Sequence, residues 1–404
     1  MSDYLRRGTP AYRRATIGLF CAGFSSFALL YCVQPLLPML ASEFKLGAAG
    51  ASLAVSSATL GVAVSLLIVG ALSDRLGRKS LMTVSLFAVV GLNLAAAAAP
   101  NWQMLLTLRF LSGVALSGAP AVAMAYLAEE IEPAGLGGAM GLYVGGNALG
   151  GMTGRLLTGA LADLTGSWRL ALAGQAALGV ITALIFLKTL PPSRHFEPAP
   201  QSRLLAYLRT VGGLFADPGL PWLLVLAFCL MGSFIALFNT LAFRLTSAPF
   251  NLGNAAVGAV FLAYLTGAPV SSFFGRMGDR YGRTPIIAAG LGVILIGLAA
   301  TLPDSLIGVV FGLCVITAAF FGTHALASAW VTARAPQARG QASALYLQFV
   351  YLGPSLIGAL SGWQWTHHGW PGVLVVLMGT FGLSLAVVLL SPLRRLGLKG
   401  SGAA

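Results

Sequence analysis

Apolar stretches recur along almost the whole chain, and this pattern limits its possible folds more than any other feature. Each stretch is about twenty residues long, the length with which an α-helix crosses the hydrocarbon core of a bilayer. Only 9% of the 404 residues are charged, whereas soluble domains carry about a quarter of charged residues. The sequence therefore predicts an all-α membrane protein.

The apolar stretches predict twelve transmembrane helices. Their expected ranges are 15–41, 49–72, 80–100, 103–128, 137–162, 169–190, 219–246, 253–275, 284–302, 305–332, 340–364 and 370–392. The only long polar connection, which contains several prolines, covers residues 191–218. We therefore expect two six-helix halves, 1–190 and 219–404, joined by a cytoplasmic linker at 191–218.

A charged loop that contains glycines occurs twice, about half the chain apart. Residues 70–79 read GALSDRLGRK, and residues 275–283 read GRMGDRYGR. The segments that follow Pro133 and Pro336 also match, with a tyrosine ten positions after each proline. Internal symmetry of this kind is typical of transporters whose two halves enclose a central cavity.

The motif G-x-L-x-D-R-x-G-R-K at residues 70–79 resembles the signature loop of the major facilitator superfamily. Chain length, helix number and the half-length repeat also fit this family. The resemblance implies a secondary active transporter that works by alternating access, is similar to bacterial drug- and sugar-export members, and is driven by protons. It also implies that the two loops form a gate across the cytoplasmic ends of the halves. The gating residues would be Asp74, Arg75, Gly77, Arg78, Asp279, Arg280 and Arg283.

Basic residues are unevenly distributed. Of the 24 lysines and arginines, only Lys45, Arg169 and Arg244 fall in segments that the twelve-helix topology places outside. Because cytoplasmic loops carry an excess of positive charge, both termini are expected in the cytoplasm and the protein in the cytoplasmic membrane. This asymmetry also explains the net charge of +13 without a nucleic-acid partner.

Two arginines, Arg109 and Arg155, fall inside predicted helices. A charge inside the membrane is costly and is a candidate for function by default. Arg109 resembles the arginine of the family's R-x-x-x-G element, which is associated with proton coupling. The alternative is an arginine that extends to the membrane surface. The repeat places glycines at both equivalent positions, so these charges belong to one half only, as substrate-binding residues would.

The glycine-rich stretch before Arg155 is similar to the glycine-proline element of family antiporters. Here Asn147 stands in place of the proline, and Leu142 in place of a glycine, which weakens an inference of drug/proton antiport. An ion pair with Asp163 is the structural alternative for Arg155.

None of the 11 acidic residues falls in the middle of a predicted helix. A cavity for cationic drugs usually needs a buried carboxylate to pair the cation. The sequence instead supplies guanidinium groups, which make paired hydrogen bonds to carboxylate or phosphate. We therefore expect an anionic or polar-neutral organic substrate.

Several polar side chains on other predicted helices are further candidates for substrate binding: Gln34, Asn147, Asn239, Tyr264, Gln348 and Tyr351. Tyr126 belongs to the same group of helix-borne polar residues, most of which could instead link helices. His324 is the sole histidine in a predicted span and is a candidate proton carrier. A packing role is the alternative for His324.

The sequence contains no H-E-x-x-H or G-x-S-x-G motif, so a membrane enzyme is a distant alternative. A symporter or uniporter that imports an organic anion is a nearer one. We expect no cofactor and no metal site, because the four cysteines lie in apolar helices without a Cys/His cluster. The expected partners are a small-molecule substrate, protons and the lipid bilayer, and the expected state is a monomer.

Overall fold

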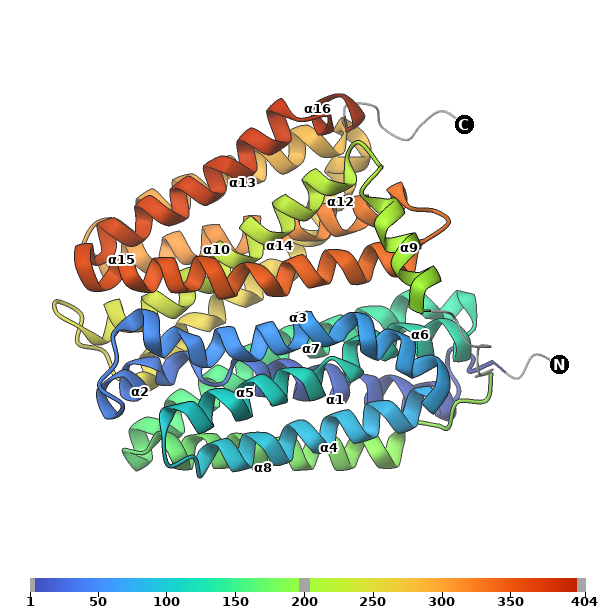
Figure 1. Ribbon diagram of the computed structural model, residues 1–404, viewed down its shortest axis with the longest axis horizontal. Coiled ribbons are helices and arrows are strands. Elements are labelled where there is room, and N and C mark those ends of the chain that lie inside the picture. The colour runs from blue at the N-terminus through green and yellow to red at the C-terminus, as the bar shows by residue number, and fades with distance from the viewer. Residues whose placement is uncertain (1–3, 196–203, 398–404) are drawn as a thin grey trace. The chain divides into compact units, whose positions relative to one another are not determined.

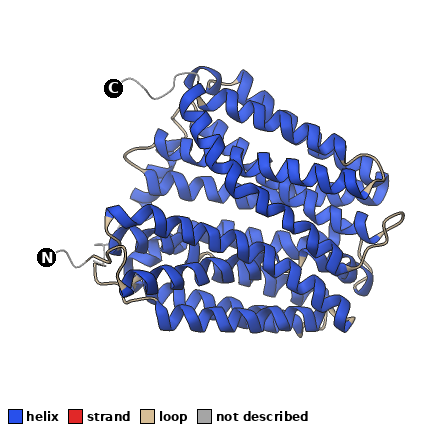
Figure 2. Cartoon of the chain, turned by 180° about the vertical axis from the view of Figure 1, so that it is seen from behind, coloured by secondary structure: helices blue, strands red, loops and turns tan. Residues whose placement is uncertain are grey.

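The computed structural model describes residues 4–195 and 204–397, and helices form nearly all of this backbone (Figure 1). Within those two ranges the chain contains no β-strand (Figure 2). Contacts divide the chain into two compact units. The first contains Met1–Met39, Ser57–Ser202 and Gly253–Gly258, and the second contains Leu40–Ser56, Arg203–Leu252 and Ala259–Ala404.

The helices of the first half of the chain are α1 (Pro10–Tyr31), the 3₁₀ helix η1 (Gln34–Leu36), α2 (Leu37–Glu43), α3 (Ala48–Leu76), α4 (Arg78–Ala97), α5 (Trp102–Leu116), α6 (Gly118–Glu130), α7 (Pro133–Thr165) and α8 (Trp168–Thr189). In the first unit, α1 packs against α7 and α8, and α4 packs against α5, α6 and α8.

The helices of the second half are α9 (Leu204–Leu214), α10 (Leu220–Thr246), α11 (Asn254–Ala259), the 3₁₀ helix η2 (Val260–Thr266), α12 (Gly267–Tyr281), α13 (Arg283–Ala300), α14 (Leu306–Arg334), α15 (Arg339–Leu390) and α16 (Leu393–Leu396). In the second unit, α10 packs against α15, and α13 packs against α14.

The prediction of twelve transmembrane helices is confirmed. Ten helical segments of the described chain are long and apolar enough to cross a membrane. One of them, α15, contains two predicted helices, because Gly369 adopts φ 62° and ψ −154° and breaks the helix there. The remaining predicted helix is α7, which has 33 residues and many glycines.

The two predicted signature loops are shorter than expected. Helix α3 continues to Leu76 and α12 continues to Tyr281, so a single glycine separates each from the next helix. Gly77 has φ 81° and Gly282 has φ 90°. Residues with a Cβ avoid this backbone region, so glycine is what allows such an abrupt turn. The predicted loops were too long, because a single glycine is enough to make each turn between two helices.

Two predicted helices are interrupted by 3₁₀ turns. The helix expected at 15–41 breaks after Tyr31 and continues as η1 and α2, next to Pro35 and Pro38. The helix expected at 253–275 contains η2 between α11 and α12. A stretch of 3₁₀ helix in the middle of a helix often marks a functional hinge or a sequence under strain.

Glycines bring α7 against the backbone of α1. A Cβ built at Gly146, Gly150 or Gly154 would collide with a backbone carbonyl of α1. These glycines are spaced four residues apart and so share one face of α7. Small residues at this spacing let helix backbones approach closely in membranes. The close approach places later residues of α7 beside the break in α1.

Candidate functional site

The break in α1 leaves backbone carbonyls at the C-terminal end of the helix, and Arg109 of α5 binds two of them. One guanidinium nitrogen, Nη1, donates to Leu29 O at 3.1 Å, and the other, Nη2, donates to Leu30 O. The last carbonyls of a helix lack intrahelical partners, and a positive charge there is favourable. Arg109 therefore stabilises the end of α1.

Arg109 also reaches α4. Its Nη1 donates to Asn93 Oδ1 at 2.9 Å, and the Asn93 side-chain amide donates to Val89 O at 2.9 Å. The Arg109 side chain is 0% exposed. The alternative of an arginine that extends to the membrane surface is therefore wrong.

Arg155 lies on the other side of the same break. Its Nε donates to Gln34 Oε1 at 2.5 Å, and its Nη1 donates to Gly151 O at 2.6 Å. The guanidinium also lies over the Tyr31 ring, 4.6 Å from its centroid. Arg155 is 1% exposed and Gln34 is 0% exposed. The structure thus brings together two of the predicted substrate-binding residues.

Asp163, the predicted structural partner of Arg155, binds a different part of the first unit. Its carboxylate accepts hydrogen bonds from the backbone N–H of Asn254 at 2.9 Å and of Ala255 at 2.7 Å. Asp163 therefore satisfies donors of the first turn of α11.

A second α7 side chain, Thr158, completes the contacts at the break. Its hydroxyl donates to Cys32 O at 2.8 Å. Arg109 of α5 and Thr158 of α7 therefore bind backbone carbonyls at the break in α1, and Arg155 of α7 binds the Gln34 side chain. The oxygens that Arg155 contacts here, Gln34 Oε1 and Gly151 O, are neutral, whereas a carboxylate can accept two parallel hydrogen bonds from one guanidinium and carries the opposite charge. An organic anion could thus displace Gln34 from Arg155.

Asn147 lies about two helical turns before Arg155 on α7. Its Oδ1 is buried and accepts no hydrogen bond within the part of the chain that the structure describes. A buried polar atom without a partner is costly, and Asn147 Oδ1 lies against Gly23 of α1, where a Cβ would collide with it.

The other predicted substrate-binding residues lie in the second unit. Asn239 on α10 is buried, Tyr264 is on η2 and partly exposed, and Gln348 and Tyr351 are on α15. His324 on α14 forms a hydrogen bond with the hydroxyl of Tyr346, at 3.0 Å between Nδ1 and the hydroxyl oxygen.

The side chains of the predicted gating residues Asp74 and Arg75 lie outside the described residues. Arg78 binds Glu129 of α6 inside the first unit, with Nη2 2.7 Å from Oε1 and Nε 3.1 Å from Oε2. This two-point ion pair connects α4 to α6 directly after the Gly77 turn.

In the second copy of the loop, Asp279 and Arg280 are exposed and Arg283 is partly buried. The guanidinium of Arg280 lies over the Tyr281 ring, 5.1 Å from its centroid.

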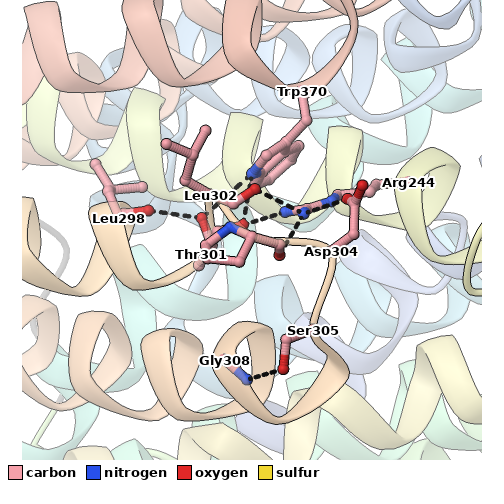
Figure 3. A network of polar contacts seen from close by, with 9 residues as sticks. Arg244, Leu298, Thr301, Leu302, Asp304, Ser305, Gly308 and Trp370 are labelled. Atoms are coloured by element: carbon pink, nitrogen blue, oxygen red, sulfur yellow. Dashed lines mark hydrogen bonds and ion pairs between the residues drawn. The ribbon is translucent and has the colours of Figure 1, made fainter.

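Arg244, which the predicted topology places on the outer side, is the centre of a buried polar network that the sequence does not indicate (Figure 3). Arg244 is 3% exposed. It donates to the carbonyls of Thr301 and Pro303 and forms an ion pair with Asp304 at 3.2 Å. Trp370 stacks on the guanidinium, 4.6 Å from ring centroid to Cζ. Most of its hydrogen-bond acceptors are backbone carbonyls, which leave no signal in the sequence.

Comparisons with known proteins agree with this architecture. The Major Facilitator Superfamily profile matches residues 19–271 and 241–403, nearly the whole chain. The uncharacterized MFS-type transporter YybF of Bacillus subtilis (strain 168) is 41% identical over 392 residues, which are 97% of this chain and 96% of YybF. The inner membrane transport protein YnfM of Escherichia coli (strain K12) is 43% identical over 375 residues, 92% of this chain and 89% of YnfM.

Among solved structures, a bacterial homolog of the human lysosomal transporter Spinster has a TM-score of 0.77 at 16% sequence identity. The match covers 98% of this chain and 100% of that chain. The profile match and the two relatives above 40% identity establish that this chain belongs to the Major Facilitator Superfamily of membrane transporters.

Proposed function

We propose that this protein exports a small organic anion across the cytoplasmic membrane, by alternating access and in exchange for protons. The observation that carries the proposal is the contact of buried Arg155 with the neutral amide of Gln34 at the break in α1. In this proposal a carboxylate of the substrate takes the place of Gln34 Oε1. Irregular backbone at such a site is common in secondary transporters, whose substrates bind at interrupted helices.

The distribution of acidic residues supports an anion rather than a cation. In the described chain, every Asp and Glu lies in the last turn of a helix, at a helix cap or in a connection. The middle of the spans therefore offers guanidinium groups and no carboxylate. A lipophilic cation would meet only like charge there, and like charges disfavour binding in a medium of low dielectric constant.

The proposed direction of transport rests on the charge of the proposed substrate. An inside-negative membrane potential favours the exit of an anion by about 2.3 kcal/mol per charge for every 100 mV. Inward movement of protons adds to this driving force. We propose His324 as the proton carrier, because its ring meets the hydroxyl of Tyr346 on the neighbouring helix α15. The orientation with both termini in the cytoplasm, and a monomeric state, belong to the same proposal.

The test is transport by the full-length protein in sealed lipid vesicles. The probes are succinate, phthalate and cyclohexane-1,2-dicarboxylate as anions, and tetraphenylphosphonium as a lipophilic cation. With acid outside, we expect at least one preloaded anion to leave the vesicles faster than from protein-free vesicles, and His324→Gln to lose this proton dependence. Anion uptake under the same gradient would instead identify an importing symporter. Movement of tetraphenylphosphonium without movement of any anion would reject the proposal.

A further inference from the structure

Three basic side chains of the first unit gather where α8 ends. Lys188 lies in the last turn of α8. Nη2 of Arg14, near the start of α1, donates to Lys188 O at 3.2 Å, and Nζ of Lys79, near the start of α4, donates to Leu190 O. Arg14 and Lys79 lie close enough for their positive charges to repel each other. We call Arg14, Lys79 and Lys188 the basic cluster.

The positive charge of the basic cluster is not neutralised by the protein. None of its three residues forms an ion pair with a residue that the structure describes. Arg14 and Lys188 are exposed, and Lys79 is partly exposed. A lysine has three N–H donors and an arginine has five, whereas the contacts with Lys188 O and Leu190 O each use one. The cluster therefore keeps donors and charge that an anion can take up.

The basic cluster lies at the end of helix faces that are exposed and apolar. Ile17 is three positions after Arg14 on α1 and is 39% exposed. On α8, Leu184 and Ile181 lie four and seven positions before Lys188 and are 41% and 55% exposed. Residues at these spacings share one face of a helix, and exposed apolar side chains of a membrane span face the hydrocarbon. The cluster thus lies beside lipid, at the level where the spans end.

The repeat shows that the carbonyl contact of Lys79 does not need a cation. When the two glycine turns are aligned, Thr284 occupies the position of Lys79. Its Oγ1 donates to Leu393 O at 2.7 Å. Leu393 is the equivalent of Leu190 when the two matching proline segments are aligned. The second half therefore makes the same contact with an uncharged hydroxyl.

The other two members of the basic cluster have no basic counterpart either. The same alignments place Gly219 at the position of Arg14 and Ser391 at the position of Lys188. A general excess of basic residues on one side of the membrane orients the chain. It does not require three of them to gather where like charges repel. Charges confined to one half of a symmetric scaffold point to a ligand rather than to the fold.

From these observations we infer that the basic cluster binds the headgroup phosphate of an anionic phospholipid. Phosphate oxygens accept strong, charge-assisted hydrogen bonds from lysine and arginine, and basic pockets between transmembrane helices bind anionic headgroups. The acyl chains of this lipid lie along the apolar faces of α1 and α8 that contain Ile17 and Leu184. The bound lipid links the starts of α1 and α4 to the end of α8. This site does not depend on the proposed substrate.

The test is native mass spectrometry of the detergent-purified full-length protein, titrated with phosphatidylglycerol, which is anionic, or with phosphatidylcholine, which has no net charge. We expect phosphatidylglycerol to bind more tightly to the wild type. Lys79→Thr copies the contact of the second half, and Arg14→Gln and Lys188→Gln remove the other charges. Each should lower the affinity for phosphatidylglycerol about fivefold, as one charge near an anionic lipid surface contributes.

The matched control is Arg395→Gln, which removes an exposed arginine of α16 in the second unit. It should retain the affinity of the wild type. Equal affinities for the two lipids, or the same loss in Arg395→Gln as in the three cluster variants, would overturn the lipid site. If inorganic phosphate displaces phosphatidylglycerol at the concentration at which the lipid binds, the cluster takes soluble anions and the lipid site fails. None of these results bears on the proposed transport, which is measured separately.

Discussion

Nε of Arg155 and Oε1 of Gln34 lie 2.5 Å apart, although 121 positions separate the two residues in the sequence. The contact depends on two local features. Glycines of α7 allow the close approach to α1, and the break after Tyr31 ends α1 before Gln34. A buried charge therefore meets an uncharged amide at an irregular point of the backbone.

Replacement of Gly77 by alanine should destabilise the protein by about 1 to 3 kcal/mol, the usual cost of a side chain in a backbone region that only glycine favours. Gly77 has φ 81° and ψ 143° at the turn between α3 and α4. Gly91→Ala on α4 is the matched control, because a Cβ there meets nothing within 4 Å. It should be neutral or stabilising. Thermal unfolding in detergent measures both, and equal midpoints for the two variants would contradict the strained turn.

Gly150→Ala should destabilise the packing of α7 on α1, because its Cβ would collide with Phe24 O. We expect a loss of about 1 to 3 kcal/mol, as for overpacking elsewhere in protein cores. The control is Gly145→Ala on the same helix, where a Cβ meets nothing within 4 Å. A thermal midpoint for Gly150→Ala at or above that of Gly145→Ala would show that the two helices are not in close contact.

Arg244→Gln should destabilise the second unit by about 2 to 4 kcal/mol, because the buried carbonyl of Thr301 and the neighbouring carbonyl of Pro303 lose a charged donor. Its ion-pair partner gives an internal comparison. Asp304 has a side chain that is 69% exposed, so Asp304→Asn should cost less than about 1 kcal/mol. Chemical or thermal unfolding of both variants measures the difference. If Asp304→Asn cost as much as Arg244→Gln, the ion pair rather than the carbonyl contacts would hold this region.

Asp217 should make stability depend on pH below neutrality. Burial acts to raise its pKa, but hydrogen bonds from Arg334, at 2.7 and 2.8 Å, and from the backbone N–H of Gly219 and Leu220 outweigh burial. The pKa is therefore lowered from its ordinary value of 3.8. A carboxyl group with a lowered pKa in the folded state stabilises the fold above its unfolded pKa. That contribution is lost as the pH falls through the folded pKa.

The measurement is the thermal midpoint of the wild type and of Asp217→Asn between pH 7 and pH 3. The wild type should exceed the variant by a constant margin above about pH 5, and the margin should shrink below about pH 4. A margin that does not change with pH would mean that the charge of Asp217 contributes nothing.

Much of the fold could be predicted from local patterns. Helices in a membrane satisfy their own backbone, so apolar length alone identifies them. Gly77 and Gly282 repeat because both turns need the same backbone conformation. The broken helices were harder to predict. Pro35 suggested a kink, but no residue of the η2 sequence indicates that its backbone leaves the α-helical form.

The site was predictable in part. Arg109 and Arg155 stood out because a charge inside a span is rare. Their hydrogen-bond partners could not be predicted, because Leu29, Leu30 and Gly151 contribute backbone carbonyls. The network of Arg244 could not be predicted for the same reason. The sequence shows which side chains are costly to bury, but the three-dimensional packing determines which carbonyl groups accept hydrogen bonds from them.

The most direct test of the proposed function is anion binding by three variants of the detergent-purified protein. Arg155→Gln removes the charge, Arg155→Lys keeps it without the paired donors of a guanidinium, and Arg169→Gln removes a charge that stacks on Trp168 instead. Isothermal titration with benzoate, succinate and phthalate reports the affinities. We predict that an anion bound by the wild type loses at least about tenfold in affinity in Arg155→Gln, less in Arg155→Lys and nothing in Arg169→Gln. Unchanged affinity in Arg155→Gln, in a protein that still unfolds cooperatively, would contradict the proposed anion site.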